Sequence, residues 1–204
     1  NVKAVWDEYS GKGVLVGVVD DGVHYTHNDL NDNYRADLDW DARNRDSDAF
    51  SSAGGDKHGT AVSGTIAAEL GNAYGGGGVA WDADLVGFRM GFGAAGSNAQ
   101  ILDLMQRQGG VHVSNNSWGF GGFLGDNFLN SGFSAIGQAI QNAAQLGRGG
   151  LGTVFVFAAG NGRADGQDVN YHDFQNSPYT IAAAATDANG NIASFSTPGA
   201  AVLI

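Results

Sequence analysis

The chain contains no cysteine, only two prolines, few basic residues and no long uninterrupted apolar run. Without cysteine, neither a disulfide framework nor a thiolate metal site is possible. Ten lysines and arginines stand against 21 acidic residues, for a formal net charge of −11. This balance argues against nucleic acid or an anionic membrane as a partner. No apolar run approaches the roughly 20 residues that cross a bilayer, so no membrane span is predicted.

Glycine and acidic residues are what the chain has in excess. The 34 glycines lie between strong apolar runs, which favours tight turns and close backbone contacts over disorder. At 204 residues and 43% hydrophobic content, the chain can bury a sizeable core, most simply as one domain. The surplus of acids suits a soluble protein whose negative charge is partly neutralised by bound cations.

The segment 13–22 has the pattern of a buried central strand. Apolar residues and glycines run without a charge and stop at Asp20 and Asp21. Such a run is typical of a parallel sheet, and chemistry in open α/β sheets lies beyond the carboxyl ends of the strands. Asp20 is therefore placed where a catalytic carboxylate would stand. In the alternative interpretation, Asp20 or Asp21 caps the next turn, since Asp-Gly is a common turn signal.

Strands and helices alternate along the rest of the chain, which predicts an α/β fold with a mostly parallel central sheet and helices on both faces. The expected strands lie at 13–19, 85–90, 110–114, 153–159 and 179–184. The expected helices cover 2–10, 58–69, 98–108 and 134–147. An acid-rich loop at 37–48 and a glycine- and phenylalanine-rich loop at 115–130 connect these elements.

Three polar side chains occupy strand ends or helix starts that suit acyl transfer. Asp20 ends a strand, His58 starts a helix, and Asn161 follows a further buried strand. A buried carboxylate can orient an imidazole, the imidazole can act as base for a nucleophile, and an amide can donate to an oxyanion. Taken singly, His58 could instead be a helix N-cap and Asn161 a left-handed turn residue.

The motifs around these residues resemble those of subtilisin-like serine proteases. Asp20-Asp21-Gly22, followed by Asp29-Leu30, is similar to the family's aspartate motif. His58–Gly64 matches the histidine motif, and Ala158–Asn161 matches the segment with the oxyanion asparagine. The doubled aspartate, Ser117–Gly119 and the segment 170–179 are closer to the kexin and proprotein-convertase branch.

The resemblance implies a serine endopeptidase that acts on peptides or proteins. Asp20 would orient His58, His58 would be the general acid and base, and Asn161 would stabilise the oxyanion. Strand-like pairing of a peptide with an enzyme edge is sequence-tolerant. The residues implied to bind substrate are Ser117, Trp118, Gly119, Gly91, Ala158, Ala159 and Gly160.

The serine nucleophile is the largest departure from the family pattern. The family carries it in a Gly-Thr-Ser motif at the start of a later helix, and no such motif occurs here. Residues 1–204 are therefore expected to be the N-terminal portion of one catalytic domain, incomplete at the C-terminus and inactive alone. The remaining part of the domain, a propeptide or an inhibitor are expected partners, and the resemblance implies a secreted, periplasmic or extracellular enzyme.

Calcium is the expected cofactor, because hard cations prefer clustered oxygen ligands. By resemblance to convertases, Asp41, Asp46 and Asp48 would hold one ion. By resemblance to a more widespread site of the family, a second set would bind another, with backbone carbonyls contributed by a glycine loop. That set consists of Asp29, Asn72, Glu69, Tyr74 and Gly76. The alternative for the acid loop is a solvated run of charges.

Specificity for paired basic residues is not expected. In convertases, acids after Ser-Trp-Gly and in the Asn-Tyr-Asp segment select arginine or lysine. Here Phe120–Gly122 replaces the first, and His172 stands at the second, with Asp173 next to it. The sequence does not show where Asp126, Asp165 and Asp168, which could compensate, are placed.

Two other functions remain alternatives. The segment Gly91–Gly96 satisfies the G-x-G-x-x-G pattern of dinucleotide-binding oxidoreductases, but the acidic partner about 20 residues further on is missing. A non-catalytic, subtilisin-like binding module would keep the fold without the reaction. The presence of Asp20, His58 and Asn161 together argues against lost chemistry.

Overall fold

The computed structural model describes residues 2–51 and 54–204. Two compact units are present in the chain. The first consists of Asn1–Leu104 and Val111–Val113, and the second of Met105–Gly110 and Ser114–Ile204. In the described residues, no helix is long and apolar enough to cross a membrane.

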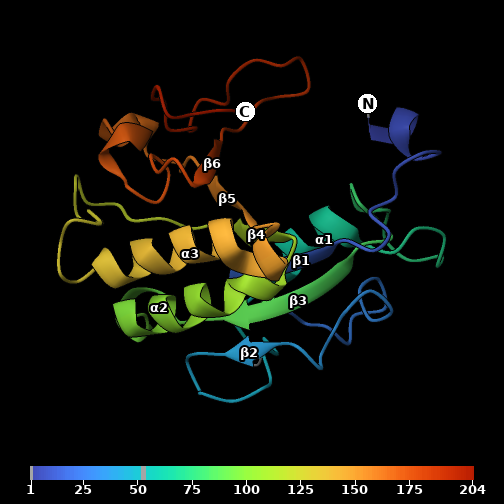
Figure 1. The fold of residues 1–204 in the computed structure, drawn as a ribbon. Helices are drawn as coiled ribbons and strands as arrows, with labels where there is room; N and C mark the ends of the chain where they lie inside the picture. Colours follow the sequence, from blue (N-terminus) through green and yellow to red (C-terminus); the bar gives the residue numbers. More distant parts are fainter. Residues whose placement is uncertain (1, 52–53) are drawn as a thin grey trace. The chain divides into compact units, whose positions relative to one another are not determined.

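The first unit is built on parallel strands. β1 (Leu15–Asp20) pairs with β3 (Asp84–Arg89), and the two-residue strand β2 (Trp40–Asp41) pairs with the same β3, in the order β2-β3-β1 (Figure 1). The register aligns both Asp20 and Asp41 with Arg89. The end of the central strand therefore carries a cation between two neighbouring aspartates.

Helix α1 (His58–Ala67) packs against β1 and β3. The buried residues of this helix are Gly59, Ser63 and Ala67, and such small side chains allow a close approach to the strands. Ala67 contributes to an apolar core with Val16, Val18, Leu30 and Leu85. This packing brings the first residue of α1 near the end of β1. The unit also contains short 3-10 turns, η1 (Val2–Val5) and η2 (Gly93–Ala95).

Helix α2 (Asn98–Arg107) begins in the first unit and ends in the second. The second unit has the strand order β4-β5-β6, with β5 and β6 parallel. The bounds are Val113–Asn116 for β4, Val154–Ala158 for β5 and Thr180–Ala183 for β6. The remaining turns are η3 (Gln108–Gly110), η4 (Arg163–Asp165) and η5 (Val169–Tyr171).

Helix α3 (Ser134–Gly150) packs against β5, and its last turns kink where Gly147, Arg148 and Gly149 leave the helical conformation. Aromatic rings fill the core of this unit: Phe174 contacts Trp118, Phe120 and Phe157 at centroid distances of 5.2–5.6 Å. These rings, in edge-on, tilted and stacked arrangements, bury large apolar areas. The core thereby supports the loops on either side of β5.

The predicted α/β fold with mostly parallel strands is confirmed. Two predicted elements were placed wrongly, and one short strand was not predicted. The helix expected at 2–10 is only the 3-10 turn Val2–Val5, the strand expected at 110–114 lies at Val113–Asn116, and β2 lies in the loop expected to be irregular. In β2, Asp41 is held by Arg89, a long-range partner that no local pattern could reveal.

Candidate active site

Asp20 and His58 meet at the carboxyl end of β1. The Nδ1 atom of His58 lies 3.0 Å from Oδ1 and 2.9 Å from Oδ2 of Asp20. Asp20 is 1% exposed, whereas the side chain of His58 is 59% exposed. The predicted pair is therefore present, with a buried acid behind an accessible imidazole.

The contact determines which nitrogen of His58 is free. An ionised carboxylate only accepts hydrogen bonds, so Nδ1 carries the proton that faces Asp20, and Nε2 is left as a proton acceptor. Burial raises the pKa of Asp20 to about 6, against the opposing effects of its hydrogen bonds from Asp21 N and His58. Above that pH the pair has the charge arrangement of an oriented general base.

Asp21 has a different task from Asp20. Its Oδ1 accepts from Gly59 N at 2.7 Å and its Oδ2 from His58 N at 3.0 Å. Lys57, at the N-cap of α1, makes no side-chain cap. Asp21 therefore satisfies two of the free N–H groups at the start of this helix. Of the two interpretations of the Asp-Asp pair, capping applies to Asp21 and pairing with the imidazole to Asp20.

Gly59 permits the close approach of α1 to the end of β1. A Cβ atom at Gly59 would lie 2.8 Å from Asp20 Cβ and would collide with the carbonyl oxygen of Gly22. The smallest side chain is thus required next to the histidine. The glycine that follows His58 in the sequence motif therefore has a steric reason.

We expect Gly59→Ala to lower the free energy of unfolding by about 1–3 kcal/mol, because the added methyl group overpacks the strand end. Gly64→Ala in the same helix is the matched control, since no atom lies within 4 Å of its Cβ position. It should gain up to about 1 kcal/mol from helix propensity. Denaturant unfolding monitored by circular dichroism distinguishes them, and equal midpoints for the two variants would contradict the steric argument.

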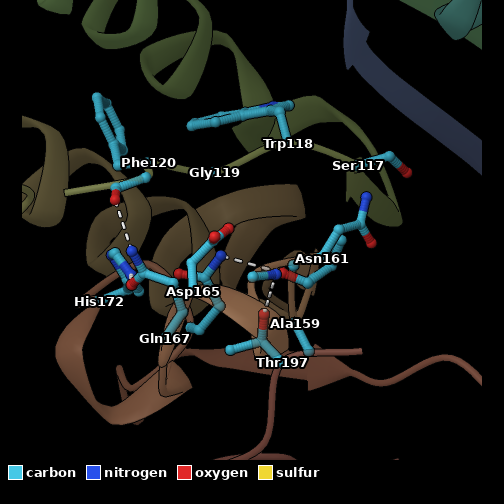
Figure 2. A pocket seen from close by; sticks show the side chains of 15 residues that line it. Ser117, Trp118, Gly119, Phe120, Ala159, Asn161, Asp165, Gln167, His172 and Thr197 are labelled. Carbon is cyan, nitrogen blue, oxygen red and sulfur yellow. Dashed lines mark hydrogen bonds between the residues drawn. The ribbon is translucent and has the colours of Figure 1, made fainter. Parts of the chain in front are cut away.

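A cavity of about 460 Å³ lies in the second unit between the strand ends. Figure 2 shows Trp118 and Phe120 on one side of it and Asn161, Gln167 and Thr197 on the other. All predicted substrate-binding residues of this unit line it together with Asn161. These are Ser117, Trp118, Gly119, Ala158, Ala159 and Gly160. The structure thus brings the residues of two separate motifs to one pocket.

His172 closes one wall of this pocket through a buried network. Gln167 Nε2 donates to Gly121 O at 2.6 Å, so that Gln167 Oε1 faces His172 Nε2 at 3.1 Å. Asp126 Oδ1 lies 2.7 Å from His172 Nδ1, and burial raises the pKa of Asp126. Both ring nitrogens of His172 therefore make hydrogen-bond contacts within this wall.

The structure also places the acids whose position the sequence left open. Asp165 lines the pocket, whereas Asp126 is buried and contacts His172 Nδ1. Asp168 caps η5 by accepting from Asn170 N, and Asp173 accepts from Phe128 N beside a different cavity. Of these four acids, one carboxylate lines the pocket.

Several pocket residues were not predicted as site residues: Phe120, Gln167, Gln175 and Thr197. Gln175 Nε2 donates to Ala158 O at 3.0 Å, and Thr197 Oγ1 accepts from Gly162 N at 2.9 Å, which holds the turn after Asn161. For Thr197, the available sequence signal was a polar residue beside the apolar C-terminal segment. In the structure Thr197 is 3% exposed, as expected for a buried polar residue with a hydrogen-bond partner.

Gly91 lies in the first unit, after β3. Its amide donates to Gln100 Oε1 at 2.8 Å, and Gln100 Nε2 donates to Ala95 O. A Cβ at Gly91 would collide with the backbone of Ala95. The glycine-rich loop is thus folded onto itself and onto α2. A dinucleotide phosphate would need free backbone N–H groups in this loop, and the N–H of Gly91 is already bonded to Gln100.

Comparison with known proteins identifies the family. The model described as Subtilase family, Peptidase_S8, matches residues 11–203. The chain belongs to the subtilase family. The curated relatives include furin of Homo sapiens, 32% identical over 201 residues, which cover 96% of this chain and 25% of the relative. Proprotein convertase subtilisin/kexin type 6 of Rattus norvegicus is 33% identical over 196 residues, 94% of this chain and 21% of the relative.

Solved structures of bacterial proteases are similar to this chain in fold. The serine protease of Aeromonas sobria aligns with a TM-score of 0.80 and 25% identity, over 95% of this chain and 36% of that protein. A protease from Pseudoalteromonas arctica PAMC 21717 aligns with a TM-score of 0.77 and 28% identity, over 99% of this chain and 65% of that one. Among the curated relatives, by contrast, the chain spans about a quarter of the length of furin and of convertase type 6.

The structure brings residues of the second predicted calcium set together around the side chain of Asn72. Asn72 Nδ2 lies 2.9 Å from Asn28 O, 3.0 Å from Asp29 Oδ1 and 3.3 Å from Glu69 Oε2. The amide nitrogen of Asn72 thus donates to three oxygens of different residues, which lie close together, and oxygens are the ligands calcium prefers. Tyr74 N donates to Asn72 Oδ1 at 3.0 Å, and Gly76 follows on the same loop.

The acid loop does not fit a calcium site in the same way. Both oxygens of Asp41 accept hydrogen bonds: Oδ2 from Arg89 Nη1 at 2.7 Å, and Oδ1 from the backbone N–H groups of Arg43 and Asn44. Asp46 accepts from Asp48 N, and Asp48 accepts from Tyr25 Oη. Within residues 2–51 and 54–204, no three His, Asp or Glu side chains gather to hold a metal.

Proposed function

We propose that this chain carries the aspartate, the histidine and the oxyanion asparagine of a calcium-stabilised serine endopeptidase. Asp20 orients His58, and His58 Nε2 takes the proton from the attacking serine hydroxyl and returns it to the leaving amine. The amide of Asn161 donates to the oxygen that becomes negative as the carbonyl carbon turns tetrahedral. Ser117–Gly119 and Gly91 pair with the peptide backbone, and Ala158–Gly160 line the pocket for the residue before the cut bond.

The contact of His58 Nδ1 with buried Asp20, at 2.9–3.0 Å, is the observation that carries this proposal. A histidine that only begins a helix does not need a buried carboxylate at one ring nitrogen. His58 has this carboxylate at Nδ1, while its side chain is largely exposed. Membership of the subtilase family supports the same reaction.

The nucleophile would come from a Gly-Thr-Ser segment, which does not occur in these 204 residues. A fluorophosphonate probe tests the reaction class. We expect an enzyme form that includes this chain and the serine segment to be labelled, and the 204-residue chain alone to remain unlabelled. A folded but unlabelled enzyme form would support the non-catalytic binding module instead.

The site around Asp29, Glu69 and Asn72 is proposed to bind calcium, with carbonyls of Tyr74 and Gly76 as further ligands. The supporting observation is the arrangement of three oxygens around Asn72 Nδ2. A bound ion would fix the glycine loop and neutralise two acids. Extracellular calcium modules operate at about 10⁻⁴–10⁻³ M ion, which is consistent with a secreted enzyme.

Chelation is expected to lower the melting temperature, because an ion bound only by the native state adds about 2.7 kcal/mol of stability at a hundredfold excess over its Kd. Differential scanning fluorimetry with and without excess chelator measures the shift. Glu69→Gln should abolish the response, whereas Asp46→Asn, in the acid loop, should keep it. A response that is lost in Asp46→Asn and kept in Glu69→Gln would move the ion to the acid loop.

The partners proposed are a peptide or protein substrate and a propeptide or protein inhibitor. One solved relative, the Aeromonas sobria serine protease, was crystallised as a complex with a chaperone. The pocket contains His172 and a single lining acid among the four considered, which supports a preference other than paired basic residues.

A further inference from the structure

Arg89, the last residue of β3, is a buried cation with three separate acceptors. It is 2% exposed. Its Nη1 donates to Asp41 Oδ2 at 2.7 Å, its Nη2 to Asp56 Oδ2 at 3.0 Å, and its Nε to the carbonyl oxygen of Asp21 at 3.1 Å. Burial alone would lower the pKa of Arg89, but the hydrogen bonds that Arg89 donates to Asp56 and Asp41 more than offset this effect, and the pKa lies above its usual value.

The charges around Arg89 are balanced within the protein. Asp41 is fully buried, and Asp56 also receives Arg43 Nη1 at 3.3 Å. Two guanidinium groups thus face two carboxylates. The positive charge that the acid loop needs at Asp41 comes from a side chain of β3, so no metal ion is required there.

Asp21 links this network to the candidate catalytic histidine. Arg89 holds its carbonyl, and its carboxylate accepts from the backbone N–H groups of His58 and Gly59. The imidazole of His58 is largely exposed. Its position is therefore determined by the Asp20 contact and by the anchoring of its own backbone, and Asp21 provides that anchor.

We propose that Asp21 and Arg89 are positioning residues for His58, with Arg89 in place of a bound cation at Asp41. Arg89 fixes the turn after β1, and Asp21 clamps the first turn of α1, so that His58 Nδ1 meets Asp20. This inference rests on the proposed peptidase function for its kinetic consequence, but the geometry it describes can be tested without turnover.

Proton NMR on the 204-residue chain reports the geometry directly. A hydrogen-bonded imidazole Nδ1–H next to a carboxylate gives a downfield resonance, and His172 beside Asp126 provides a second such pair in the same spectrum. We expect Asp21→Ala to broaden or shift the His58 resonance and to leave that of His172 unchanged. Asp21→Asn, which keeps one acceptor, should be intermediate.

Kinetics on the enzyme form that contains the serine give the second measurement. Asp21→Ala is expected to lower kcat about 10–100-fold with KM within about twofold, since a misplacement of about 1 Å can reduce the rate a hundredfold. Arg89→Lys keeps the charge but loses the fork that reaches three acceptors, so it should fall between wild type and Arg89→Met. Arg35→Met, which breaks the exposed pair with Asp37, is the control expected to match wild type.

The outcomes are separable. Variants of Asp21 and Arg89 that lose only thermal stability, with the His58 resonance and kcat as in wild type, would overturn the positioning role. If Arg89→Met does not fold, Arg89→Lys and the Asp21 variants decide. A wild-type enzyme without peptidase activity, whose His58 resonance still depends on Asp21, would reject the proposed function and keep the geometric inference.

Discussion

Replacing His58 with alanine is expected to lower kcat for peptide hydrolysis by about 10⁶-fold, the loss caused by removing the histidine of a serine protease triad in a related enzyme. Without the imidazole, nothing at the end of β1 can take the serine proton, because Asp20 is buried and 1% exposed. The folded state should remain, since the His58 side chain is largely exposed and its removal leaves no cavity in the core.

Hydrolysis of a fluorogenic peptide by the enzyme form that contains the serine measures this loss. His24→Ala is the matched control, because His24 is an exposed histidine of the same unit with no assigned role. Circular dichroism of both variants reports the fold. If His58→Ala kept turnover within tenfold of wild type, the assignment of the general base would be wrong.

Asp20→Asn is expected to stabilise the fold near neutral pH while it removes the orienting charge. Burial raises the pKa of Asp20 to about 6, from a usual value of 3.8. The native state therefore holds this proton more tightly than the unfolded chain, and stability falls as pH rises between these two values. Above about pH 6 the full penalty applies, on the order of 3 kcal/mol, and asparagine, which does not ionise, escapes it.

Urea unfolding of the 204-residue chain at several pH values measures this effect. The difference between Asp20→Asn and wild type should disappear below about pH 4, where both side chains are uncharged. Asp37→Asn is the control of opposite sign, because Arg35 lowers the pKa of the exposed Asp37. A wild-type chain that is more stable than Asp20→Asn at neutral pH would contradict the argument.

The second prediction concerns a carboxylate, that of Asp20, whose burial is unfavourable for stability. An ionised group is buried at a strand end, against its preference for water, and its position favours the oriented imidazole. Functional sites commonly retain such groups at a loss of stability. Asp20 and Asp21 have different roles: the more accessible Asp21 caps a helix, whereas the buried Asp20 faces the imidazole.

The pocket of the second unit shows how far motifs could predict the site. Ser117–Gly119 and Ala158–Asn161 were found from the sequence, because each follows a strand and carries a recognisable residue order. Gln167, His172 and Asp126 were not assembled from the sequence into one network. Asp126 and His172 are 46 residues apart, and only the fold makes them neighbours.

The sequence by itself determined the family and the alternating α/β elements, and the resemblance of its motifs implied the pairing of Asp20 with His58. These depend on local patterns: an apolar run that ends in acids, a helix that starts at a histidine, and glycines where the backbone must pass closely. Tertiary structure alone decided that Arg89 faces Asp41 and that Asp21 clamps the first turn of the helix that begins at His58. Strand register and chain packing set those contacts, which join residues 33–68 positions apart, and no local pattern encodes a distance in space.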